Sequence, residues 1–178
     1  EFSSFRRCSG VSTGGGVHLV GGSGHVITDC TFDDCTGSSG AGMFVNADAI
    51  DVIGCGFTGN DASSNGGGLY ADSASSTIED NVFTDNDASS GGGLFLQSAD
   101  NAVVDVNLFT GNAASNGGGL RVNGGTDVAV TANVVTDNTA GSRGGGLYLS
   151  TASPDVIDNE ITGNEATGSE GGGAWVNA

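Results

Sequence analysis

The stretch FTGNDASSNGGGLY, residues 57–70, places three consecutive glycines directly before an apolar leucine. Glycine at this density is typical of a flexible linker, whereas an apolar residue straight after it is typical of a strand that enters a core. The neighbouring sequence separates the two interpretations. A linker has no repeat, but one coil of a repeat protein has copies of the same motif at a fixed distance.

The motif occurs seven times along the chain. Its lead apolar residue recurs at spacings of 27, 25, 26, 26, 26 and 26 residues, and each copy continues into a glycine-rich triplet like the one at 66–68. The lead residues are Phe5, Phe32, Phe57, Phe83, Phe109, Val135 and Ile161. Residues 57–70 therefore belong to a repeat of about 26 residues and not to a linker.

Apolar residues two positions apart, such as Leu69 and Ala71, follow each triplet and indicate a strand with one buried face. A second strand is predicted five residues before the lead position, at Ile27, Val52, Ile78, Val104, Val130 and Val156. Because a short strand cannot pair within its own copy, it must pair with its equivalent in the next. The sequence thus predicts an all-β fold, a parallel β-helix solenoid of about seven coils of about 26 residues, right-handed by the usual crossover preference.

The repeats leave no region outside them, so we expect one β-solenoid domain over residues 1–178. The coils fall near 1–16, 17–42, 43–68, 69–93, 94–119, 120–146 and 147–173, with a partial coil at 174–178. At about 4.8 Å per coil, the rod would be about 33 Å long.

The chain carries 21 acidic residues against four arginines, with a formal charge of −17. Nucleic acid and direct membrane insertion are therefore not expected, because phosphate binding needs basic side chains and a membrane span needs roughly 18 apolar residues in succession. The acidity suits solubility or the binding of divalent cations.

Two columns of asparagine run through the alignment of the copies. They are Asn60, Asn86, Asn112, Asn138 and Asn164 after the lead residue, and Asn81, Asn107, Asn133 and Asn159 before it. Stacked amides hydrogen-bond to their neighbours in cross-β structures. We interpret both columns as structural ladders at the corners of the coil.

The four cysteines occupy these same two columns, with Cys8 and Cys35 in the first and Cys30 and Cys55 in the second. Equivalent positions in adjacent coils lie about 4.8 Å apart, which is within the range of Cα separations that disulfides allow. We therefore predict the disulfides Cys8–Cys35 and Cys30–Cys55, formed in an oxidising, extracellular compartment. Four unpaired thiols are the alternative.

An outward column rich in aromatic residues lies between the two inward columns of the glycine-led strand. Its members are His18, Phe44, Tyr70, Phe95, Arg121, Tyr148 and Trp175. Three interpretations remain open: stacking that stabilises the sheet, lateral packing against another rod, and stacking on the flat faces of sugars.

No catalytic constellation is visible. The chain has no Ser/His/Asp set, P-loop or dinucleotide fingerprint, and His25 near Asp29 is a weak signal. We predict no catalytic residue and no cofactor, and a polysaccharide lyase or hydrolase is the least favoured alternative. Acidic residues around the corner after the first asparagine column make calcium a candidate ligand: Asp61, Asp85, Asp87, Asp137 and Glu165.

With the repeats aligned, the chain resembles the right-handed parallel β-helix proteins, and in particular the GGA(I/L/V) and FxxN repeats of polymorphic outer-membrane proteins and autotransporter passenger domains. The resemblance rests on the motifs at 66–69 and 117–120 and on those at 57–60 and 83–86. It departs from that family in using GGG where GGA is usual. The resemblance implies a secreted or surface-displayed, adhesin-like or structural module.

From these observations we expect a non-catalytic, extracellular or cell-surface structural β-solenoid, a fibre subunit or an adhesin module. The last copy stops after its glycine-led strand, so the start of one subunit would complete the final coil of the next. We expect self-assembly, head to tail or lateral. A fragment of a longer solenoid explains the ends equally well, and a carbohydrate-binding module that uses the aromatic column is the alternative function.

Overall fold

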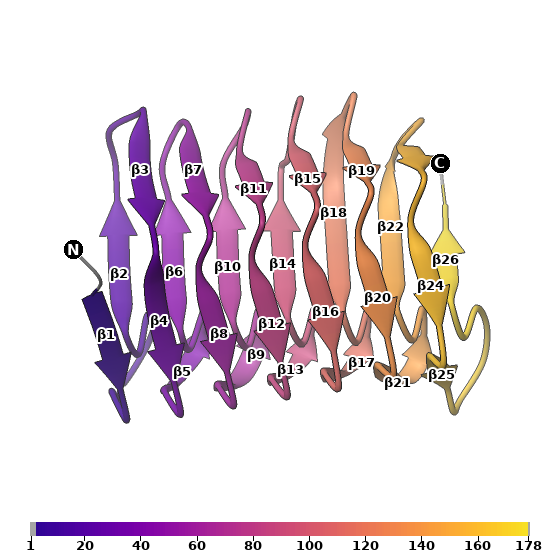
Figure 1. Cartoon of the computed structure of the whole chain (residues 1–178), viewed down its shortest axis with the longest axis horizontal. Coiled ribbons are helices and arrows are strands. Elements are labelled where there is room, and N and C mark those ends of the chain that lie inside the picture. Colours follow the sequence, from indigo (N-terminus) through magenta and orange to yellow (C-terminus); the bar gives the residue numbers. More distant parts are fainter. Residues whose placement is uncertain (1–2, 178) are drawn as a thin grey trace.

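The computed structural model describes residues 3–177 as a rod of stacked coils built from strands alone (Figure 1). The predicted all-β parallel solenoid of about seven coils is confirmed. Residues 1, 2 and 178, which the predicted domain includes, lie outside the described residues. The part of the chain that the structure describes contains no helix of the length and apolarity needed to cross a membrane.

Four parallel sheets run along the rod, and each strand pairs with its equivalent one coil away. The Phe sheet, which holds the lead residues, comprises β1 (Ser3–Arg6), β4 (Cys30–Asp33), β8 (Gly56–Thr58), β12 (Val82–Thr84), β16 (Leu108–Thr110), β20 (Val134–Thr136) and β24 (Glu160–Thr162). The Leu sheet, which follows the glycine triplets, comprises β2 (Val17–Val20), β6 (Met43–Asn46), β10 (Leu69–Asp72), β14 (Leu94–Gln97), β18 (Leu120–Thr126), β22 (Leu147–Ala152) and β26 (Ala174–Val176).

The other two sheets have six strands each. The Val sheet comprises β3 (His25–Thr28), β7 (Ile50–Ile53), β11 (Thr77–Glu79), β15 (Val103–Asp105), β19 (Ala129–Thr131) and β23 (Asp155–Ile157). The Ala sheet comprises β5 (Thr36–Ser39), β9 (Asp61–Asn65), β13 (Asp87–Ser90), β17 (Ala113–Asn116), β21 (Thr139–Arg143) and β25 (Glu165–Ala166). A complete coil therefore passes through a Phe, an Ala, a Leu and a Val strand in that order.

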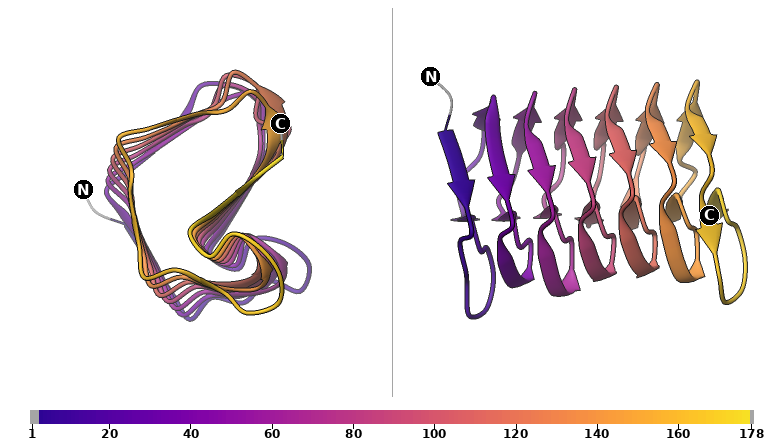
Figure 2. Two further views of the ribbon diagram at one scale, coloured as in Figure 1. Left: turned by 90° about the vertical axis from the view of Figure 1, so that its right-hand side faces the viewer. Right: turned by 60° about the horizontal axis from the view of Figure 1, so that its bottom comes forward.

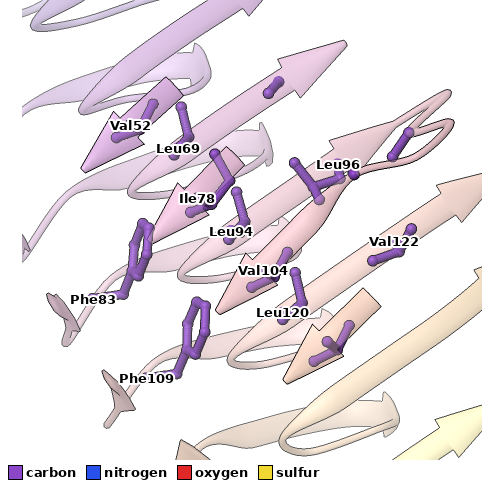
Figure 3. Close-up of a cluster of buried hydrophobic side chains, with 14 of the residues drawn as sticks. Val52, Leu69, Ile78, Phe83, Leu94, Leu96, Val104, Phe109, Leu120 and Val122 are labelled. Carbon is purple, nitrogen blue, oxygen red and sulfur yellow. The ribbon is translucent and has the colours of Figure 1, made fainter. Parts of the chain in front are cut away.

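The Phe, Leu and Val sheets enclose the main core, and Figure 3 shows their side chains pointing into it. Phe57, Phe83 and Phe109 are fully buried and stack in parallel, with neighbouring ring centroids 4.8 Å apart. Each such pair adds about 0.5–1.5 kcal/mol beyond the burial of its area. The core is therefore a series of similar layers, each packed against the equivalent layer of the next coil.

The glycine triplet turns the chain back against the Ala sheet, and Figure 2 shows this fold in end view. The first glycine, as at Gly91, has a φ of 60°, a left-handed conformation that favours glycine. A Cβ on the second, Gly67, would lie 2.5 Å from the carbonyl oxygens of Asp87 and Gly92. The triplet is thus required by backbone conformation at one position and by close backbone contact at another.

Both predicted asparagine ladders form, and their side chains are buried through the middle coils. In each ladder the Oδ1 atom accepts from the backbone and side-chain N–H groups of the asparagine one coil earlier. For Asn112, these bonds from Asn86 measure 3.0 and 2.9 Å. Its own Nδ2 donates to the carbonyl of Phe83 and to Oδ1 of Asn138, both at 2.9 Å. One side chain therefore links three coils.

Replacing Asn112 with alanine should lower the free energy of unfolding by about 3 kcal/mol. The substitution removes the acceptor of two buried donors of Asn86 and one donor to the carbonyl of Phe83, and a buried donor left without an acceptor costs about 1–3 kcal/mol. Urea denaturation followed by circular dichroism measures the loss. Asn164→Ala, in the partly exposed last rung, is the control and should cost less; equal losses in the two variants would contradict the ladder account.

Candidate functional site

The aromatic column forms one continuous stack along the outer face of the Leu sheet. Ring centroids lie 4.9 Å apart for His18–Phe44, 5.0 Å for Phe44–Tyr70, 5.4 Å for Tyr70–Phe95 and 4.4 Å for Tyr148–Trp175. Arg121 fills the remaining position, with its Cζ 5.3 Å from the ring of Phe95 and 4.7 Å from that of Tyr148. The structure brings all seven predicted residues together.

The column is less exposed than an outward ribbon would be, and this corrects the expectation from sequence. Phe95 is only 4% exposed, and the other members except His18 are half-buried. The cause is a second column, at the ends of the Ala-sheet strands, that lies beside the first across the glycine turn: Thr13, Ser39, Asn65, Ser90, Asn116, Arg143 and Glu170. We call the space between the two columns the inside corner.

Hydrogen bonds join the two columns of the inside corner. Thr13 Oγ1 and His18 Nδ1 lie 2.7 Å apart, and Trp175 Nε1 donates to Glu170 Oε2 at 3.2 Å. Arg121 donates to the hydroxyl of Ser90. This second column is the part of the site that sequence reasoning missed, because its polar residues, from serine to arginine, have no periodic apolar signal.

Arg121 differs from the other three arginines in its electrostatic environment. Arg6, Arg7 and Arg143 lie 3.4, 3.9 and 3.5 Å from carboxylates. Among residues 3–177, no carboxylate forms an ion pair with Arg121, and desolvation by the surrounding rings lowers the pKa of its guanidinium. Stacking on two aromatic faces offsets part of that desolvation.

We expect Arg121→Ala to lower the melting temperature, because it removes two cation–π contacts and opens the stack. The loss should be about 1–2 kcal/mol in the free energy of unfolding. Arg121→Tyr, which restores a ring between two rings, should be as stable as the parent chain. Differential scanning calorimetry compares the variants, and a tyrosine variant less stable than the alanine one would refute the stacking account.

The four cysteines continue the asparagine ladders toward the N-terminal coil, as predicted. Cys35 N–H donates to Asn60 Oδ1 at 3.0 Å, and Cys30 N–H donates to Cys55 Sγ at 3.4 Å. The structure holds all four as thiols, and burial raises the pKa of Cys55 to about 11. The members of each predicted pair are neighbours in adjacent coils, and formation of the two disulfides stays a prediction.

Mild oxidation should form Cys8–Cys35 and Cys30–Cys55 and raise the free energy of unfolding by about 3 kcal/mol for each bridge, since each closes a loop of some 26 residues. Peptide mapping without reductant identifies the pairs, and any other pairing would contradict the column assignment.

In the reduced protein, the raised pKa of Cys55 favours the neutral thiol of the folded state. The contribution of the neutral Cys55 thiol to the free energy of unfolding should be complete below pH 9.0, the ordinary pKa of a cysteine. It should disappear as the pH rises through about 11, the pKa in the folded state. Denaturation of the reduced protein across this range tests the sign, with Cys55→Ser as the control.

The acidic residues considered for calcium are not brought into one cluster. Asp61 and Asp87 pair in register at the start of the Ala-sheet strands, where burial and then the charge of Asp61 raise the pKa of Asp87. Glu165 is in the same column but is separated from Asp87 by two coils without an acid. Within residues 3–177 there is no group of three or more His, Cys, Asp or Glu side chains that could hold a metal ion.

The other two calcium candidates lie at the corner between the Phe and Ala strands. Asp85 and Asp137 have φ values of 53° and 56°, and the coils between and beyond them carry Gly111 and Gly163 at the same position. Asp85 and Asp137 are therefore two coils apart, about 10 Å. The weak His25–Asp29 pair is not formed either, since His25 Nε2 instead bonds the carbonyl of Gly21 at 2.8 Å.

A family model described as "Right handed beta helix region" matches residues 15–178. Searches of curated proteins and of solved structures gave no match. The match agrees with the observed solenoid and with the handedness predicted from the parallel crossovers.

Proposed function

Because the chain belongs to the right-handed β-helix family, we propose that it is a non-catalytic, extracellular structural module, a fibre subunit or a surface adhesin, whose coils stack end to end. The resemblance to the repeats of polymorphic outer-membrane proteins and autotransporter passengers supports the same proposal.

The observation that carries the proposal is the use of the polar and aromatic side chains as links between coils. The asparagine amides bond the coils before and after them, as Asn86 and Asn138 do through Asn112. The aromatic rings stack on their equivalents, and the hydroxyl of Ser90 bonds Arg121 of the next coil. Groups that a binding or catalytic site would present to a ligand are used here to hold the rod together.

The first and the last coil of the described rod carry residues at equivalent positions of the same columns. Phe5 and Ile161 lie in one column, His18 and Trp175 in another. A coil like the first would therefore continue the stack beyond the last, whether another copy or further chain supplies it. Such a contact is heterologous and produces a filament when copies of the chain supply it.

Electron microscopy and sedimentation velocity test end-to-end assembly. We expect filaments, or sedimentation coefficients that rise with protein concentration. Ile161→Asp places a charge on the end of the Phe column and should abolish assembly. Ile157→Asp changes a 50% exposed isoleucine on the side of the same coil and is the matched control. Isolated rods at all concentrations would refute assembly by this chain.

The alternative, glycan binding by the aromatic column, would have to use ring edges. Sugars stack on ring faces, and the faces within the column are covered by neighbouring rings at 4.4–5.4 Å. A glycan array separates the two functions: binding that is lost in Tyr70→Ala and Tyr148→Ala would favour the carbohydrate-binding module, and turnover of an acidic polysaccharide would favour an enzyme.

A further inference from the structure

An exposed apolar surface lies on the side of the rod, at the corner where the Val sheet meets the Phe sheet. Val82 is 42% exposed, Val106 50% and Val134 38%. Leu108 is half-buried and Ala132 is exposed at the same corner. We call this surface the apolar corner, and its members are Val82, Val106, Leu108, Ala132 and Val134.

The members of the apolar corner are neighbours across three successive coils. Val82 pairs in register with Leu108, and Leu108 with Val134, on β12, β16 and β20, which lie side by side in Figure 1. Val106 directly follows β15 (Val103–Asp105), the adjoining strand of the Val sheet, and Ala132 is its equivalent one coil on. Since paired strands are about 4.8 Å apart, these side chains form one continuous surface. The outward carboxylate of Asp105, in register with Glu79, borders this surface on the Val-sheet side and separates it from Val103.

Backbone strain coincides with this surface. Val106 has a φ of 54° and Ala132 a φ of 50°, whereas Asp29, Asp80 and Asp158 occupy the same corner position in other coils. The left-handed conformation suits glycine, asparagine and aspartate, but a β-branched residue in it is an outlier. Because Val106 is half exposed, burial within its own chain does not offset the strain. Strained residues of this kind cluster at functional sites, which directs attention to this surface.

Carboxylates bracket the apolar corner along the rod. Glu79 and Asp80 lie on the first of its coils, and Asp158 and Glu160 lie on the coil after its last valine. Three coil spacings, about 14 Å, separate the two acidic groups, which an extended segment covers with about four residues. A second copy placed on this surface would bring carboxylates against carboxylates. The chain has no lysine, three of its four arginines pair with its own carboxylates, and Arg121 is stacked between two rings.

We propose that the apolar corner is a docking surface for a protein segment with a short aliphatic stretch flanked on both sides by lysine or arginine. The aliphatic side chains cover the exposed valines, and the cationic flanks meet Glu79 and Asp80 at one end and Asp158 and Glu160 at the other. The surface is on the side of the rod, so docking does not depend on end-to-end assembly.

Fluorescence anisotropy with three labelled peptides tests the proposal on the full chain. One peptide carries a Val-Leu-Val-Leu core between pairs of lysines, the second has glutamates for the lysines, and the third has serines for the core. We expect the first to bind, more tightly at low salt, and the other two to bind at least tenfold more weakly.

Variants assign the binding to the apolar corner. Val106→Asp should weaken binding roughly tenfold or more, and Val106→Gly should weaken it while raising the melting temperature, because the strain is removed. Val26→Asp is the matched control. It alters a 58% exposed valine on β3 of the Val sheet, outside the apolar corner, and should leave binding unchanged.

Three results would overturn the proposal. The first is no binding of the lysine-flanked aliphatic peptide, and the second is equal binding of the serine-core peptide. The third is a salt-promoted dimer of the chain that Val106→Asp abolishes, which would make a second copy the occupant. Because Ile161→Asp leaves this surface intact, loss of filaments in that variant with retained peptide binding separates docking from assembly.

Discussion

Every side chain in the middle of this rod lies next to its own equivalent in the coil before and the coil after, at the spacing of paired strands. That constraint decides which residues a column accepts. Phenylalanine rings stack on themselves with centroids 4.8 Å apart, and asparagine amides both donate to and accept from their copies. These residue types are self-complementary, so a column of them stabilises every interface between coils at once.

Charged residues are not self-complementary, and one corner of the coil shows how like charges are kept apart. At the corner between the Phe and Ala strands, aspartate and glycine alternate through Asp34, Gly59, Asp85, Gly111 and Asp137. Each of these aspartates has a glycine in the next coil, so like charges are about 10 Å apart instead of about 5 Å. Oδ1 of Asp85 occupies the space that a Cβ on Gly111 would need. The rod therefore has a 26-residue backbone period and a 52-residue charge period at this corner.

Sequence periodicity predicted the parts of the fold in which a column of large or amide side chains repeats: the Leu and Val sheets, both asparagine ladders and the aromatic column. It located the column of lead residues but assigned no strand to it. It did not predict the Ala sheet. That sheet packs Ala62 and Ala88 against the glycine turn, and residues this small carry no alternation of apolar and polar side chains. The burial of Phe95 was missed for the same reason. The residues that cover it are the ends of Ala-sheet strands, which were not predicted. Acidic residues that are close in the repeat alignment were likewise separated in space by whole coils.

In a molecule built of equivalent positions, a residue that differs from its column is informative, because the backbone environment is nearly constant along the column. Arg121 departs from a column of rings, and its contacts explain it: two aromatic faces and the hydroxyl of Ser90 replace the missing ring. Val106 and its neighbour Ala132 depart from a column that otherwise holds aspartate and glycine, and nothing within the chain explains Val106, since it is strained and half exposed. Contacts within the chain therefore compensate for the missing ring at Arg121 and stabilise the rod. The strain and exposure of Val106 have no such compensation within the chain. For that reason a partner is to be sought at the apolar corner on the side of the rod, more than at the aromatic column.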